Sequence, residues 1–311
     1  MRFNKLDLNL LVALDAMLST CSISRAAERL HLSQSAMSNA LARLREYFDD
    51  ELLVQVGRRM ELTPRAEVLK EAVRDVLMRV DTTITAQPEF DPLRSEREFR
   101  IFVSDYSLST LMPHLMVLAH EQAKRVRFHL LPQVEQPQRA LEQGEADLLV
   151  IPKEFCSPDH PTDTVFLDDF VCAVCNQGRF RDRELTLDSY LAAGHVIMQP
   201  PAGGQSLESD FMRRHGVDRR VEVSTFSFMT APHLVVGTDR IATLHRRLAL
   251  QASRHLPIRL LAPPLPIPPM VQVMQWHKHR SKDPGLLWLR QTLKAAAARM
   301  DEIASAALAT P

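Results

Sequence analysis

The hydrophobic period of this 311-residue chain changes once, at a stretch that contains two prolines. Before residues 87–92, apolar residues recur every three or four positions, which is the period of amphipathic helices. Beyond that stretch, short apolar runs alternate with helical segments, and this order predicts parallel sheet flanked by helices. Pro88 and Pro92 interrupt the helical pattern, because proline lacks the backbone donor and clashes with the preceding turn. We therefore expect a multi-domain protein with an all-α part followed by an α/β part.

The composition is that of an ordinary globular protein, with 45% apolar and 24% charged residues. Lysine plus arginine equal aspartate plus glutamate at 38 each, so the overall charge does not indicate a nucleic-acid partner. Locally the balance differs, since Arg25, Arg29, Arg43 and Arg45 are accompanied between residues 25 and 45 by one acid, Glu28. A nucleic-acid site must therefore be argued from local geometry.

The N-terminus predicts neither a signal peptide nor a membrane span. Asp7, Asn9 and Asp15 interrupt its apolar run, and no small-residue cleavage site follows. Four cysteines in 311 residues do not form a disulfide framework, which fits a reducing cytoplasm. Cys172 and Cys175 lie in a strand-like run, where residues three apart point to opposite faces. We expect both thiols to be buried and structural.

The motifs predict no catalytic set. The twelve histidines are scattered, with only His277 and His279 closely spaced, and H-E-x-x-H, P-loop and G-x-S-x-G motifs are absent from the sequence. We expect no enzyme activity, no metal and no cofactor. The alternative is a small-molecule-binding protein or enzyme with an accessory N-terminal domain. A signal peptide would favour this alternative.

The first fifty residues have the layout of a helix-turn-helix. Residues 7–18 form a helical pattern, residues 23–30 a shorter one, and a third helix follows with Ser33 as its N-terminal cap. In such a motif the second of its two helices, here the third helix of the chain, lies in the DNA major groove. The buried side of the third helix is expected to carry Met37, Leu41 and Leu44.

The opposite face of that third helix carries short amides and hydroxyls in place of the long Glu and Lys side chains of a solvated helix. A slim polar face suits a groove about 12 Å wide, in which Gln and Asn read adenine through two atoms and Arg binds phosphate or guanine. A solvated polar face is the competing interpretation.

Residues 51–62 predict a short hairpin with Gly57 at its turn and a basic tip. Beside a helix-turn-helix, a basic hairpin tip forms a wing that can contact the phosphate backbone or the minor groove. The candidate DNA-binding residues are Ser33, Gln34, Ser35, Ser38, Asn39, Arg43, Arg58 and Arg59.

A helix with a narrow apolar stripe is predicted to start at Pro64. The stripe has three- and four-residue steps and exceeds what one small domain needs to cover itself, which suggests a partner helix. The candidate dimerisation residues are Leu69, Val73, Val76, Val80 and Ile84.

The order of these motifs resembles that of LysR-type transcriptional regulators. The segments that carry the resemblance are LDLNLLVALDAML, SISRAAERLHLSQSAMSNALARLRE, LTPRAE, FRIFVSDY, GEADLLVIP, GTDRIATLHRRLA and QWHKHRSKDPGLLWLR. It spans essentially the entire chain and is strongest to the branch that contains the nodulation regulator NodD. Ser35 stands where the family often has Pro, and Asn39 where many members carry a long basic residue, so the operator bases can differ.

The resemblance implies a winged helix-turn-helix domain over residues 1–62, a linker and dimerisation helix over 63–90, and an effector-binding regulatory domain over 91–311. The regulatory domain is expected to be two-lobed and α/β, like periplasmic binding proteins, with lobe 1 at about 91–163 and 266–311 and lobe 2 at about 164–265.

The implied partners are double-stranded operator DNA, a small-molecule effector, and further copies in a homodimer or homotetramer, with RNA polymerase a candidate. NodD relatives respond to flavonoids and neighbouring branches to aromatic acids, so the resemblance favours an aromatic effector.

Loops at strand ends are the candidate effector site, because ligands of open α/β sheets bind beyond the carboxyl ends of strands, near helix N-termini. Core packing is the competing explanation for the two phenylalanines in these loops, and capping or turn formation for the serines and glycines. The candidates are Ser104, Asp105, Tyr106, Ser107, Gln199, Gly203, Gly204, Phe226 and Phe228.

Overall fold

The computed structural model of the chain describes residues 6–57, 59–80, 89–133, 136–200 and 205–309. It divides into two compact units, the first comprising Met1–Pro88 with Glu142–Gly144 and the second the rest of the chain. The first is helical with one hairpin, and the second contains two five-stranded sheets. The predicted fold class, a helical DNA-binding domain followed by a two-lobed α/β domain, is confirmed. No helix in the described part of the chain is long and apolar enough to span a membrane.

The helices of the first unit begin where their caps are in the sequence. Ser22 and Ser33 each accept a backbone N–H from the first turn of the helix that follows, and Asp7 accepts the N–H of Leu10 at 2.9 Å. The elements are α1 (Leu8–Thr20), α2 (Ile23–Arg29), α3 (Gln34–Phe48), β1 (Leu53–Val56), β2 (Arg59–Leu62) and α4 (Pro64–Val80). The predicted helix-turn-helix and hairpin are both present.

Helix α4 packs back onto α1, which changes the interpretation of its apolar stripe. Val73 is 4% exposed, so it packs into the core of this unit and is not on an open seam as predicted. Leu69 is partly buried against the same core, and its role between chains stays a prediction. Arg74 fixes the packing through its Nε, 2.9 Å from Asp15 Oδ1. Val76 is 43% exposed, while Ile84 lies outside the described residues.

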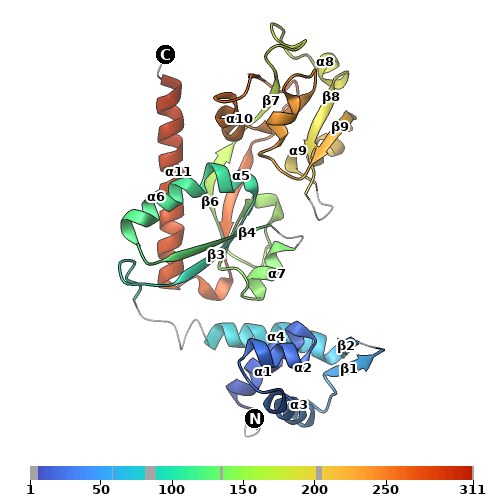
Figure 1. Cartoon of the computed structure of the whole chain (residues 1–311), viewed down its shortest axis with the longest axis vertical. Helices are drawn as coiled ribbons and strands as arrows, with labels where there is room; N and C mark the ends of the chain where they lie inside the picture. The colour runs from blue at the N-terminus through green and yellow to red at the C-terminus, as the bar shows by residue number, and fades with distance from the viewer. Residues whose placement is uncertain (1–5, 58, 81–88, 134–135, 201–204, 310–311) are drawn as a thin grey trace. The chain divides into compact units, whose positions relative to one another are not determined.

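The first sheet of the second unit has the strand order β4-β3-β5-β12-β6. Its strands are β3 (Glu98–Val103), β4 (Arg127–Pro132), β5 (Leu148–Pro152), β6 (Thr162–Asp168) and β12 (Met270–Gln275). The accompanying helices are α5 (Asp105–Thr110), α6 (Met112–Gln122), α7 (Pro137–Glu142), η2 (Lys153–Phe155), η4 (Lys278–Arg280) and α11 (Pro284–Ala309). Helices α6 and α11 pack on each other beside this sheet (Figure 1).

The second sheet has the order β11-β7-β10-β8-β9. Its strands are β7 (Phe170–Cys175), β8 (Gly194–Met198), β9 (Arg220–Thr225), β10 (Ile241–His245) and β11 (Ile258–Leu261), with α8 (Leu187–Leu191), α9 (Leu207–Arg214), η3 (Ala231–Val235) and α10 (Arg246–Ser253). Cys172 packs into one core and Ala173 into the core on the other face, as a two-residue period requires. Cys172 and Cys175 are both buried and free.

Both sheets are mixed, whereas the sequence pattern predicted parallel sheets. Strand β12 is antiparallel to β5 and β6, and β7 is antiparallel to β10 and β11, because the chain passes between the lobes twice and reverses direction. Strand β6 belongs to the first sheet up to Asp168, so the predicted lobe boundary at residues 163 and 164 falls inside β6. Helices α5 and α6 are separate, with Pro113 in the first turn of α6.

Candidate functional site

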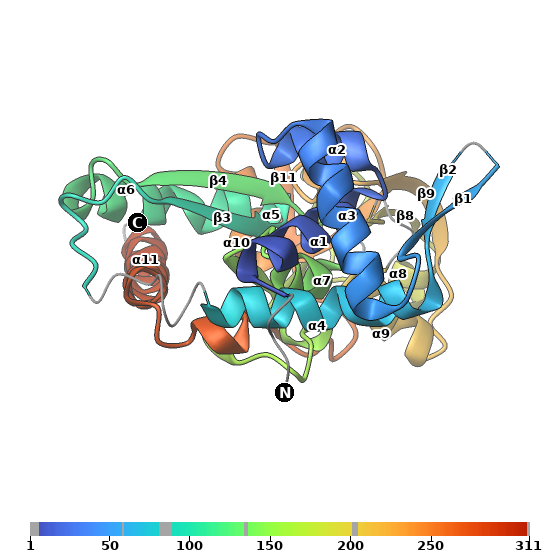
Figure 2. The same ribbon diagram turned by 90° about the horizontal axis from the view of Figure 1, so that it is seen from below.

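The exposed face of α3 carries the residues predicted to contact DNA. Gln34, Ser38 and Asn39 are exposed. Met37, which directly precedes Ser38 in the sequence, is fully buried. The Ser33 side chain accepts the N–H of Ala36 at 3.1 Å and thereby fixes where this helix begins. Figure 2 shows α2 and α3 side by side, with the β1–β2 hairpin projecting beyond them. Ser35 is exposed on the first turn of α3 as well.

The arginines near this face differ in their surroundings. Arg43 is exposed and lies 3.6 Å from Asp7, whereas Arg45 donates to the backbone oxygens of Glu51 and Leu53, both at 2.8 Å. Arg45 therefore connects α3 to the start of the wing, a role that the helical pattern did not reveal. Arg59 is exposed on β2, and Arg58 lies outside the described residues. The wing turns at Gly57, whose φ of +63° favours glycine.

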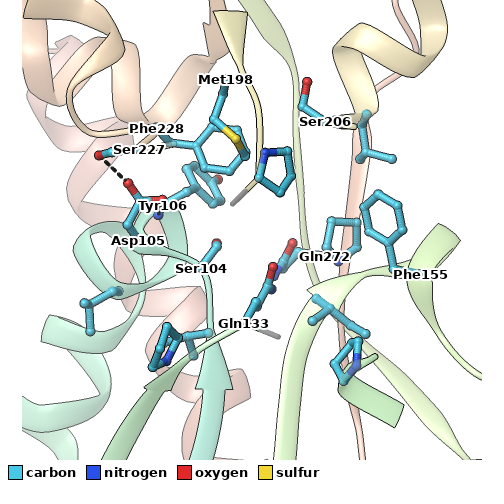
Figure 3. Close-up of a pocket in the computed structure, with 18 of the residues that line it drawn as sticks. Ser104, Asp105, Tyr106, Gln133, Phe155, Met198, Ser206, Ser227, Phe228 and Gln272 are labelled. Carbon is cyan, nitrogen blue, oxygen red and sulfur yellow. Dashed lines mark hydrogen bonds between the residues drawn. The ribbon is translucent and has the colours of Figure 1, made fainter. Parts of the chain in front are cut away.

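A cavity of about 720 Å³ lies between the two lobes of the second unit. Val103, Leu130 and Ile151 line it from β3, β4 and β5 of the first sheet, and Met198 and His245 from β8 and β10 of the second. Its wall is mostly apolar with a few polar side chains, the usual composition of a small-molecule site (Figure 3).

Most of the predicted effector residues within the described part of the chain meet at this cavity. Ser104, Asp105, Tyr106, Phe226 and Phe228 all line it. Phe226 is 73% exposed, so core packing does not explain it.

The remaining predicted effector residues do not line the cavity or lie outside the described residues. Ser107 is fully buried, and its Oγ accepts a hydrogen bond from Gln272 Nε2. Gln199 is exposed and is not part of the wall. Gly203 and Gly204 lie outside the described residues.

One carboxylate connects the two lobes across the edge of the cavity. Asp105 Oδ2 accepts the Ser227 hydroxyl at 2.7 Å (Figure 3). The same oxygen accepts the backbone N–H of Met229 at 3.1 Å. Asp105 begins α5 of the first lobe, whereas Ser227 and Met229 follow β9 of the second. We call this contact the interlobe clasp.

A buried polar cluster lies at the same junction of the lobes. The Tyr106 hydroxyl donates to Asp168 at 2.6 Å, and the backbone N–H of Arg247 donates to the same carboxylate at 3.3 Å. Burial raises the pKa of Asp168 to about 6 and lowers the pKa of His245 to about 3. His245 therefore contributes no charge to the cavity at neutral pH.

The cavity also contains residues that the sequence reasoning missed. Gln133 directly follows β4, so the strand-end rule that selected Ser104 could have found it. Gln272 lies within an antiparallel strand, and Phe155 ends a 3₁₀ turn, so no sequence motif marked either residue. Within the described residues, no group of three His, Cys, Asp or Glu side chains could hold a metal ion.

Two family models match this chain. The model described as "Bacterial regulatory helix-turn-helix protein, lysR family" matches residues 8–67, and the "LysR substrate binding domain" model matches residues 94–298. The chain belongs to the LysR family. As a member of this non-enzymatic family it is a transcriptional regulator, with a DNA-binding domain and an effector-binding domain.

Relatives of this LysR-type regulator match it over nearly its full length. Nodulation protein D 1 of Sinorhizobium fredii is 40% identical over 302 residues, which are 97% of this chain and 94% of the relative. Nodulation protein D of a Bradyrhizobium species is 39% identical, over 96% of this chain and 89% of the relative.

Solved structures of other regulators share the fold of this LysR-type chain. A probable transcriptional regulator of Pseudomonas aeruginosa is 29% identical, with a TM-score of 0.64 over 94% of this chain and 98% of that one. Full-length OxyR of Pseudomonas aeruginosa has a TM-score of 0.72 over 94% of each chain, and at 18% identity it supports the fold alone.

Proposed function

We propose that this LysR-type regulator acts in the cytoplasm and that a small, uncharged aromatic effector, bound in the cavity between its lobes, switches the operator complex. The observation that carries this proposal is the cavity itself, whose wall comes from both lobes. A ligand that contacts both lobes favours one relative orientation of them, by its difference in affinity for the two orientations. In this proposal Gln34, Ser38 and Asn39 read bases, while Arg43 and Arg59 bind phosphates.

The charges around the cavity support an uncharged effector over an aromatic acid. None of the described residues that line the cavity is lysine or arginine. Asp105 brings a negative charge, and His245 is neutral at physiological pH. A carboxylate ligand would lose its hydration without a cation to replace it, which is costly.

Two exposed aromatic side chains support an aromatic effector. Phe155 is 46% exposed on the first lobe and Phe226 is 73% exposed on the second, and both line the cavity. Both rings belong to the wall of one mostly apolar cavity, which is the usual composition of a small-molecule site. A planar ligand that stacks on either ring removes apolar area from water and gains the favourable geometry of an aromatic pair.

The assembly we propose is a homodimer formed through α4, which can pair further into a homotetramer. Val68 and Val76 are 75% and 43% exposed, and they lie just over two turns apart on α4, about 80° from each other around the helix. Two recognition helices held at a fixed spacing would bind two half-sites together, which raises the effective concentration at the second half-site.

The test uses two cavity variants of the full-length protein. Met198→Trp fills the cavity and Ser104→Ala removes a hydroxyl from its wall. We expect both to bind the operator like the parent in mobility-shift titrations. In a thermal-shift screen of uncharged aromatic compounds and matched aromatic acids, Met198→Trp should lose the ligand-induced rise in melting temperature. If both variants keep the ligand response, the effector site lies elsewhere.

A further inference from the structure

Two glutamine side chains at the cavity have their amide nitrogens hydrogen-bonded to the protein. We infer that Gln133 and Gln272 present fixed carbonyl oxygens to the effector and so select a ligand that donates hydrogen bonds, such as a phenol, over its ether or carboxylate analogue. The inference rests on the proposed function, because it assumes that the effector occupies this cavity. It adds the residues that determine specificity and the chemical group that they recognise.

Gln272 is the more constrained of the two. It lies in β12 and is only 1% exposed, and it lines the cavity. Its Nε2 donates to Ser107 Oγ at 3.1 Å, and Ser107 is itself fully buried. Its Oε1 has no hydrogen-bond partner in the described part of the protein. A buried carbonyl without a partner destabilises the protein by its lost hydration, and a donor from a ligand would remove that cost.

Gln133 repeats this arrangement from another strand end. It follows β4, and its Nε2 donates to the backbone oxygen of Val150 in β5 at 3.3 Å. This bond uses one of the two amide hydrogens and fixes the orientation of the side chain, so that Oε1 is an acceptor for a ligand. Figure 3 shows both glutamines reaching into the cavity beside Ser104.

Several other polar groups of the cavity are already satisfied within the protein. Asp105 accepts from Ser227 and Met229, and the Tyr106 hydroxyl donates to Asp168. Ser104 Oγ accepts the backbone N–H of Ser107 at 3.2 Å. Gln272 Oε1, by contrast, is a buried acceptor without a donor among the described residues, and a site built to hydrogen-bond a hydroxyl rejects analogues that lack it.

The experiment uses three naphthalenes of matched shape with the full-length protein. 2-Naphthol offers a donor, 2-methoxynaphthalene offers only an acceptor, and 2-naphthoate is an anion. By titration calorimetry we expect 2-naphthol to bind about tenfold more tightly than the other two, the effect of roughly one hydrogen bond. Gln272→Met and Gln133→Met should each bring the naphthol-to-ether affinity ratio toward one. Gln251→Met, a glutamine of α10 outside the cavity wall, should leave the ratio unchanged.

The cavity-filling variant Met198→Trp separates the ways in which the inference can fail. Suppose that the ether or naphthoate binds the parent as tightly as naphthol and that Met198→Trp abolishes that binding. The proposed role of the two glutamine carbonyls is then wrong, and the cavity is still the effector site. If no probe binds, or if binding survives Met198→Trp, the proposed cavity fails together with the inference. Should Gln272→Met fail to fold, the exposed Gln133 still decides the result.

Discussion

Arg43 and Arg45 are two positions apart on α3 and have different surroundings. Arg45 donates to two backbone oxygens at the start of the wing, and such contacts fix the position of a loop without reading any base. Arg43 is exposed beside Asp7, so it remains accessible to a phosphate. Both residues are arginines, so the residue type does not distinguish their roles. The positions of the nearest hydrogen-bond acceptors do distinguish them.

The first prediction concerns Asn39 on the exposed face of α3. Asn39→Ala should cost about 1–3 kcal/mol of binding free energy at one base pair of the operator and relax the preference there. Competition binding with operators changed one base pair at a time measures this. A uniform loss of affinity across all operators would contradict base reading by Asn39.

A second prediction concerns Arg59 on the wing. Arg59→Ala should weaken binding to every sequence alike and reduce the slope of log K against log salt by about one, because one fewer counterion is released. Titrations at several salt concentrations provide the slope. Arg45→Ala is the contrasting variant, since it should lower both the stability of the wing and the affinity of the protein for DNA.

The third prediction concerns the pH dependence of folding at Asp168. Burial raises its pKa to about 6, so the folded state holds the proton more tightly than the unfolded state does. The stability that this proton contributes is full below about pH 4 and is lost as the pH rises through 6. Asn at this position can still accept the Tyr106 hydroxyl without carrying a charge.

Asp168→Asn should therefore gain stability relative to the parent as the pH rises. The difference in the free energy of unfolding should grow by up to about 3 kcal/mol between about pH 4 and pH 7. Urea titrations at both pH values measure it. An equal difference at both would mean that Asp168 titrates normally in the folded protein.

At the scale of elements, α4 has a buried apolar face and an exposed one. Val73 packs into the core of its unit, whereas Val76, three residues on, is exposed. The sequence period placed Val73 and Val76 in one stripe, because residues three apart are neighbours on a helix surface and the period does not show what covers each of them.

The fourth prediction separates these two faces. Val76→Glu should shift the assembly toward monomers in sedimentation velocity and leave the melting temperature of the domain nearly unchanged. Val73→Ala should lower the free energy of unfolding by about 2 kcal/mol, from lost burial and an unfilled cavity, and leave the assembly intact. A dimeric Val76→Glu protein with normal operator binding would show that α4 does not form the contact between chains.

At the scale of the whole molecule, the interlobe clasp is a polar contact between elements distant in the chain. Asp105 precedes Ser227 by 122 residues, and the chain crosses between the lobes in between. The clasp connects the lobes at the cavity edge, so it favours one relative orientation of the lobes even without a ligand.

The fifth prediction follows from the clasp. Asp105→Ala removes a charge-assisted acceptor from Ser227 and Met229, and such hydrogen bonds contribute roughly 1.5–3 kcal/mol. The backbone amide of Met229 should then exchange hydrogen on the order of tenfold faster in the absence of ligand. Unchanged exchange at Met229 would show that the lobe orientation does not depend on this carboxylate.

The sequence by itself determined the order of elements and the identity of the recognition helix. Caps such as Ser22 and Ser33 act on the N–H groups of the next turn, and hydrophobic period depends on neighbours along one helix or strand. These are local interactions, so local sequence is sufficient to predict them. The strand-end rule also found Ser104, Asp105 and Tyr106, because loops at the carboxyl ends of parallel strands meet at one edge of a sheet.

Only the tertiary structure decided which polar groups face the cavity and which strands run antiparallel. Gln272 became a cavity residue because β12 returns to the first sheet beside β5, a pairing between positions more than a hundred residues apart. That same return places Gln272 where it donates to the buried Ser107, and Val73 was buried because α4 folds back on α1. Burial and hydrogen-bond partners depend on contacts distant in the chain, and no pattern within one segment specifies them.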